Sequence, residues 1–168
     1  MKHIFLRTMA ATAFAFAAAI MFGDDFEEQF LLAACPSANP TLSRVVVTAN
    51  GPGVRHKPGS VQDVVLFCQV HADASNFFNW LQLVAEDNTP DAYAQATLWR
   101  MDTVSPRPPV PLYSTTTSDQ PGVQIAVNDT LYDTLDEEQY VYWIEVRLVR
   151  TTPDASVIVY STGLKDVF

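Results

Sequence analysis

Three tryptophans form the most distinctive chemical pattern in this 168-residue chain. Side chains two positions apart lie on the same face of a β-strand, so residues of one parity can be grouped. The groups are Trp80 with Gln82, Trp99 with Gln95 and Thr97, and Trp143 with Glu145 and Arg147. Flat aromatic rings beside hydrogen-bonding groups can stack on sugar rings or anchor a protein interface. The spacing therefore predicts a polar-aromatic sheet face drawn from three strands; the alternative is a second core covered by loops or by the N-terminal arm.

The sequence offers no recognisable catalytic constellation. Histidine is scarce, with His3 near the N-terminus and His56 and His71 further along. The sequence contains neither a Gly-x-Ser-x-Gly nucleophile motif nor a cysteine–histidine motif. Carboxylates are plentiful, but glycoside hydrolysis needs two at a set separation, and only Glu145 sits on a predicted strand beside aromatic residues. We predict no catalytic residues and no enzyme activity, with a hydrolase as a third functional class.

Metal binding has one set of candidates. Asp87, Asn88 and Asp91 fall in one predicted loop, and hard oxygen ligands from a loop suit Ca²⁺. A second acidic loop spans residues 129–138, and neither loop has the EF-hand spacing. Two cysteines and two histidines outside the leader argue against a closed zinc site. The sequence thus predicts no cofactor, and names Asp87, Asn88 and Asp91 as candidates for a structural calcium ion.

The chain has two cysteines, Cys35 and Cys68. In an oxidising compartment such a pair most simply forms a disulfide, which here would tie an N-terminal arm to a central strand. Two buried free thiols are the alternative. Leu32–Cys35 also has the form of a lipobox, but acidic residues within 24–28 separate it from the apolar run that a lipobox should follow directly. Membrane attachment is expected only if Cys35 is lipidated.

The N-terminus has the pattern of a secretory signal. Lys2 and Arg7 precede an uncharged stretch from Thr8 to Phe22, which is too short for a comfortable membrane span. We predict a signal peptide over residues 1–19, with cleavage anywhere from 19 to 34. An extended arm over 20–43 and a β-sandwich domain over 44–168 are expected to follow. The protein is predicted to be exported, to the periplasm or outside the cell.

Charge excludes one class of partner. The formal net charge is −9, and cleavage after residue 19 would remove Lys2 and Arg7 and make it −11. An acidic surface repels nucleic acid and anionic lipid. Nucleic-acid binding is therefore set aside.

The elements that must position these residues are strands. In Gln139–Arg150, Tyr, Ile, Val and Leu alternate with a second set that includes Trp143, which predicts a strand with one face in a core. Turn signals separate it from the other predicted strands, which are 44–49, 62–71, 80–85, 92–101, 110–114, 123–127 and 156–164. Asn50–Gly53 is expected as a turn. Seven or eight short strands predict an all-β, antiparallel β-sandwich.

A wider pattern supports that fold class. Between Gly59 and Leu164 the order of features resembles a set of uncharacterised exported bacterial jelly-roll-like β-sandwich domains. The matching features are Phe67-Cys68, the polar loop 73–76, Leu98-Trp99-Arg100, the Ser/Thr-rich stretch 114–118, Tyr140–Leu148 and the closing strand 157–164. The resemblance implies a jelly-roll-like sandwich and carries no active site. The Pro-rich loop 105–111 and the acidic loop 129–138 depart from it.

The leading functional prediction is a non-catalytic exported module that acts by protein–protein contact at or outside the cell envelope. A protein partner or self-association is preferred over a glycan. The alternative is a carbohydrate-binding module that uses the same tryptophan face. Both hypotheses depend on whether Trp80, Trp99 and Trp143 are exposed together.

Overall fold

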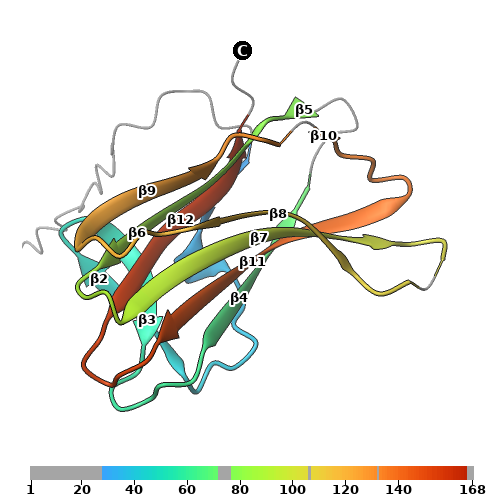
Figure 1. The fold of residues 1–168 in the computed structure, drawn as a ribbon. Helices are drawn as coiled ribbons and strands as arrows, with labels where there is room; N and C mark the ends of the chain where they lie inside the picture. The colour runs from blue at the N-terminus through green and yellow to red at the C-terminus, as the bar shows by residue number, and fades with distance from the viewer. Residues whose placement is uncertain (1–27, 72–76, 106, 132, 166–168) are drawn as a thin grey trace, which may run out of the picture.

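A computed structural model describes residues 28–71, 77–105, 107–131 and 133–165 as two antiparallel β-sheets packed face to face (Figure 1). The signal segment and the loop 73–76 lie outside the described residues. Within the described part the chain has no α-helix, only one short 3₁₀ turn at Leu32–Ala34. No helix in that part is both long enough and apolar enough to span a bilayer.

The first sheet, sheet A, has the order β2-β3-β12-β6-β9. A sixth strand, β1, pairs with the same edge of β12 as β3 does. Its strands are β1 (Glu28–Leu31), β2 (Ser43–Thr48), β3 (Gly51–His56), β6 (Trp80–Asp87), β9 (Gly122–Asn128) and β12 (Val157–Lys165). Short strands β5 (Phe77–Phe78) and β10 (Asp133–Thr134) form a separate two-stranded ribbon.

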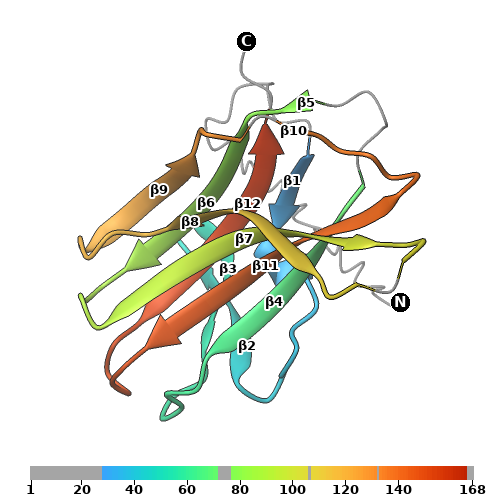
Figure 2. The same cartoon turned by 45° about the vertical axis from the view of Figure 1, so that its right-hand side comes forward.

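The second sheet, sheet B, has the order β4-β11-β7-β8 (Figure 2). Its strands are β4 (Val64–Val70), β7 (Ala92–Asp102), β8 (Val110–Thr116) and β11 (Tyr140–Arg150). β11 is central and pairs with β7 over its whole length, so Trp143 lies directly opposite Trp99. The connection between β7 and β8 projects beyond the body of the sandwich.

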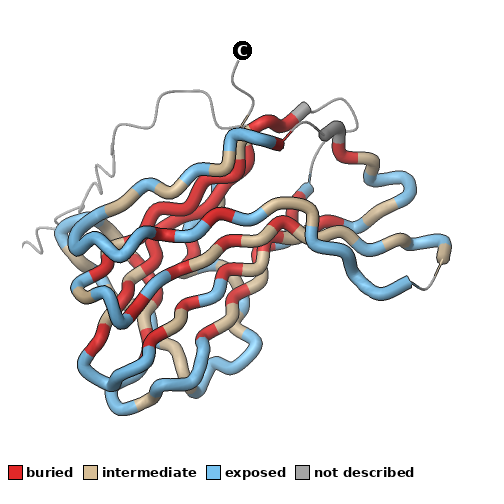
Figure 3. The backbone as a smooth tube through the Cα atoms, viewed as in Figure 1, coloured by how far each residue is buried: buried red, intermediate tan, exposed pale blue. Residues whose placement is uncertain are grey.

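The core lies between the two sheets and follows the alternation read from the sequence. Inward residues of β11, such as Ile144 and Val146, are fully buried, as are Ala94 and Leu98 of β7. Buried segments run along β6, β12 and the sheet B strands in the interior of the sandwich (Figure 3). The all-β, antiparallel sandwich is thus confirmed.

Two details of the predicted organisation differ from the structure. The sandwich contains ten strands in the described residues rather than seven or eight, because β1 and β3 were not expected. Asn50–Gly53 was expected as a turn, but only the Ala49–Asn50 link turns. Gly51 has a φ of 106°, a backbone conformation that glycine adopts readily and other residues rarely do. It is already the first residue of β3.

Gly53 lies on β3, close to the neighbouring strand β12 of the same sheet. A Cβ atom at this position would stand 2.7 Å from Ile158 Cγ2 and 2.9 Å from the Val159 carbonyl oxygen. The backbone oxygen cannot move aside without disturbing the sheet. We expect Gly53→Ala to lower the free energy of unfolding by about 1–3 kcal/mol, with Gly53→Val costing more. Urea denaturation would measure this, and a loss no larger than that of a neutral surface change would contradict it.

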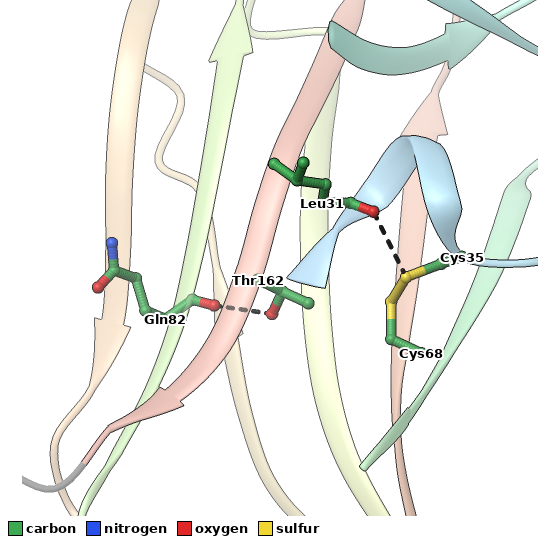
Figure 4. The surroundings of a disulfide bond; sticks show 5 residues. All are labelled: Leu31, Cys35, Cys68, Gln82 and Thr162. Atoms are coloured by element: carbon green, nitrogen blue, oxygen red, sulfur yellow. Dashed lines mark hydrogen bonds between the residues drawn. A yellow bond between two sulfur atoms is a disulfide. The ribbon is translucent and has the colours of Figure 1, made fainter. Parts of the chain in front are cut away.

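The described part of the predicted N-terminal arm, residues 28–43, is joined to the sandwich. Leu32 is fully buried in the core, and Cys35 and Cys68 form a disulfide with their Cα atoms 5.0 Å apart (Figure 4). The Leu31 carbonyl oxygen lies 3.9 Å from Cys35 Sγ. Closing the loop between these two cysteines stabilises the fold by roughly 3–4 kcal/mol in the chain-entropy estimate.

The predicted disulfide is confirmed, and it excludes the lipidated form of Cys35 in this structure, because its Sγ is already bonded. The next residues extend the join. Pro36 O accepts a hydrogen bond from Phe67 N at 2.9 Å, and Ala38 N donates to Val65 O at 2.9 Å. This short run covers the free edge of β4.

His56 is buried at the end of β3, with only 2% of its surface exposed. Burial, aided by the positive charge of Arg150, lowers its pKa to about 4, although Asp63 opposes the shift. The folded state therefore favours neutral His56. The free energy of unfolding is therefore highest, as far as this group is concerned, above the unfolded pKa of about 6.5. It decreases as the pH falls from there toward 4.

We expect acidification from pH 7 to pH 4 to cost the wild type about 3 kcal/mol through this histidine alone. His56→Leu should flatten the profile over the same interval, because it removes the titrating group while keeping the site apolar. Unfolding free energies at several pH values would measure the difference between the two profiles. Parallel profiles for the two proteins would show that His56 does not titrate in this way.

Candidate functional site

The candidate site is the outer face of sheet B. Alternation sends one parity of β7 and β11 into the core, so the other parity must face outward. Trp99 and Trp143 belong to this outward set and are partly exposed. Because they are opposite each other in register, their rings stack with centroids 6.3 Å apart and planes 6° from parallel. Two neighbouring strands thus present one paired aromatic surface.

A shallow hollow of about 380 Å³ lies over this aromatic pair. We call it the tryptophan hollow; its lining residues are Phe67, Trp99, Pro109, Trp143 and Glu145. Phe67 comes from β4 and Pro109 from the residues just ahead of β8, where a register shift between Leu98 and Trp99 brings Pro111 opposite Trp99. The lining is therefore assembled from the whole width of sheet B.

Polar side chains continue the same face along the strands. In the register of β11 and β7, Glu145 lies opposite Thr97 and Arg147 opposite Gln95. Arg147 Nη2 donates to Glu145 Oε1 at 3.1 Å, and Gln95 Nε2 donates to Thr116 Oγ1 at 3.3 Å.

Arg147 Nη1 is also 3.8 Å from Asp63 Oδ2. The Arg147–Asp63 pair is exposed on both sides and contributes little to stability, so Arg147 can leave Asp63 at low cost. An aromatic half and a hydrogen-bonding half therefore adjoin on one surface, as the sequence predicted for these two strands.

Trp80 does not belong to this face, which corrects the prediction of a three-tryptophan surface. Its strand, β6, lies in sheet A, and its ring faces Lys165, whose Nζ is 5.8 Å from the ring centroid. Gln82 on the same strand is buried, with 6% of its surface exposed. Parity along a strand assigns a residue to a face of its own sheet, and it does not say in which sheet the strand lies.

Two lining residues, Phe67 and Pro109, were not among the predicted site residues. Phe67 could have been found, because it shares the outward parity of β4 with Gln69 in an otherwise apolar strand. Pro109 carries no such signal. It reaches the hollow only through the pairing of β8 with β7, which local sequence does not determine.

Two of the three calcium candidates, Asp87 and Asn88, use a side-chain oxygen in a hydrogen bond to the backbone. Asp87 Oδ1 accepts a hydrogen bond from Thr89 N at 3.1 Å, and Asn88 Oδ1 accepts one from Ser156 N at 2.8 Å. Burial raises the pKa of Asp87, although hydrogen bonds from the backbone of Thr89 and Asn88 oppose the shift. Among the residues that the structure describes, no three His, Cys, Asp or Glu side chains are grouped closely enough to hold a metal ion.

No protein-family model matches the sequence, and no curated protein matches it either. Solved structures share its fold. The C-terminal family 22 carbohydrate-binding module of Clostridium thermocellum Xyn10B has 9% sequence identity and a TM-score of 0.53, covering 86% of this chain and 95% of that one. A family 36 carbohydrate-binding module, solved with calcium and xylotriose, has 9% identity and a TM-score of 0.51, covering 82% and 99%.

These neighbours bear on the functional predictions. Both are β-sandwich carbohydrate-binding modules, so the comparison favours the carbohydrate alternative over action by protein contact. The prediction of a protein partner or self-association in preference to a glycan is wrong on this comparison. At this level of identity the likeness establishes a β-sandwich of the same fold.

Proposed function

We propose that this chain is a non-catalytic carbohydrate-binding module that holds a glycan on the outer face of sheet B. The observation that carries the proposal is the stacked, partly exposed pair Trp99 and Trp143 over the tryptophan hollow. One neighbour of the same fold is solved with xylotriose, and in the other, conserved amino acids of the cleft have a role in ligand binding.

The chemistry of the face suits a sugar. The apolar C–H face of a pyranose ring can lie on an indole, which supplies large rigid contact area. Hydroxyl groups then need donors and acceptors at the edge of the ring. Glu145, Thr97 and Gln95 supply both kinds beside the aromatic pair. A few such polar groups in a mainly apolar hollow fix the orientation of a ligand.

Charge selects the kind of glycan. The formal net charge is −9, and Glu145 places a carboxylate in the lining itself. An anionic chain would meet repulsion both at a distance and at the hollow. We therefore propose a neutral oligosaccharide as the ligand.

The proposed setting is the periplasm or the outside of the cell. A disulfide persists in an oxidising compartment, and the leader pattern over residues 1–19 predicts export. Leu32 packs in the core and β1 pairs with β12, so we place the signal cleavage ahead of β1 and within the predicted interval. No catalytic role is proposed.

Titration of the exported protein with soluble oligosaccharides tests the proposal. Intrinsic tryptophan fluorescence and calorimetry would be followed with neutral xylo-, gluco- and galacto-oligosaccharides, and with oligogalacturonate as the anionic comparison. Saturable binding of a neutral series with a change in emission is the expected result. Absence of binding to every neutral sugar, or preference for the anionic one, would overturn the proposal.

A further inference from the structure

We infer that the glycan site extends past the tryptophan hollow across β4 into a second hollow beside the disulfide, so that the protein prefers long oligosaccharides to short ones. This inference rests on the proposed function. It is carried by the second hollow, by the residue that the two hollows share, and by the way the N-terminal segment is held in place.

The second hollow has a volume of about 370 Å³, close to that of the first. We call it the disulfide hollow. One wall is formed by β1 and the turn after it, and includes Gln29, Phe30 and Leu31. The opposite wall is formed by β4. Leu31 is 57% exposed, so an apolar side chain borders this hollow at the protein surface.

Phe67 lines both hollows, so the two border on the same residue of β4. Gln69, two residues further on the same outward face, lines the disulfide hollow and lies opposite Trp143 in register. Strands are about 4.8 Å apart, so the face from β8 to β4 spans roughly 14 Å before the second hollow begins. The combined surface is longer than one sugar ring and runs across the strands.

The two hollows also share a chemical character. Each joins apolar surface, from Trp99 and Trp143 in one and Phe30 and Leu31 in the other, to uncharged or acidic hydrogen-bonding groups. Among the described residues that line them, none is basic. A single neutral chain with alternating apolar faces and hydroxyl edges would meet the same kind of surface along its length.

The second hollow depends on the disulfide. Cys35 and Cys68 both line it, and their bond holds the turn after β1 against β4. The pairing of Pro36 and Ala38 with the edge of β4 fixes the same segment from the other side of the cysteine. A wall held by these joins keeps its shape without a ligand, which reduces the ordering cost of binding.

Chain-length dependence tests the inference. The oxidised protein and a Gln29→Ala/Leu31→Asn double variant would be titrated by calorimetry with neutral oligosaccharides of two to eight residues from whichever series binds. Both replaced side chains lie on the surface, so folding should be preserved. Val47→Asn is the matched control, because Val47 is 73% exposed on β2 of sheet A, away from both hollows.

In the wild type and the Val47→Asn control, affinity should rise with chain length beyond the three shortest members. The double variant should lose about tenfold on the longest chains and nothing on the shortest. A flat length dependence in the wild type, or an equal loss at all lengths, would overturn the second hollow and leave the proposed function standing. Failure of every oligosaccharide to bind the wild type would overturn both.

Discussion

Replacing Trp143 with alanine should abolish most of the glycan affinity while leaving the fold intact. Trp143 is central in sheet B, stacks on Trp99 and lines the tryptophan hollow. Aromatic anchors at the centre of a binding surface typically contribute at least about 2 kcal/mol, which corresponds to a roughly 30-fold weaker complex. Calorimetric titration with the best-binding neutral oligosaccharide measures the loss.

Trp80→Ala is the matched control for that experiment. It removes the same side chain from a partly exposed strand position, but on sheet A and beside Lys165. Its oligosaccharide affinity should equal that of the wild type. Equal losses in the two variants would mean that the Trp99–Trp143 surface has no special part in binding.

The largest expected loss of stability follows from Arg150→Met. Arg150 is the last residue of β11, points inward and is 4% exposed, and its pKa is lowered chiefly by burial. Its guanidinium donates hydrogen bonds to four backbone carbonyl oxygens. Nη2 donates to Lys57 O at 2.8 Å, Nη1 donates to Pro153 O at 2.9 Å and Ala155 O at 3.1 Å, and Nε donates to Ser60 O.

Methionine would retain apolar volume but donate nothing, leaving these carbonyls of two loops without their donor. Each buried unsatisfied group costs about 1–3 kcal/mol, and solvent can reach some of them, so we expect a total loss of about 3–4 kcal/mol. Chemical denaturation provides the measurement. Arg147→Met, on the same strand but the exposed face, should cost less than about 1 kcal/mol. Similar costs for both would refute the role assigned to Arg150.

The sequence was most informative where one strand carries its own signal. The alternation in Gln139–Arg150 identified a strand, its buried side and the outward position of Trp143, because both faces are determined by a period of two. The same reasoning placed Trp99 correctly on β7. Both of these strands are long and bounded by clear turn residues, which leaves little freedom in their register.

The rest depended on contacts between distant segments. Trp80 obeys the same parity rule, but its strand pairs with β12 and β9, and nothing in residues 80–87 records that choice. Gly51–Gly53 has the composition of a turn, yet it pairs with β2 as part of a strand, and at Gly53 the close approach of β12 leaves no room for a Cβ atom. Phe67 gains its place in the site only when β4 docks beside β11.

The pairing of β1 with β12 also has a consequence for how the protein is made. Leu31 lies opposite Ser161, so a strand from the beginning of the fold is completed by one near its end. Contacts so distant in the chain form slowly and cannot form until both segments have left the ribosome. The nascent chain must therefore stay without a finished sheet A through most of its synthesis.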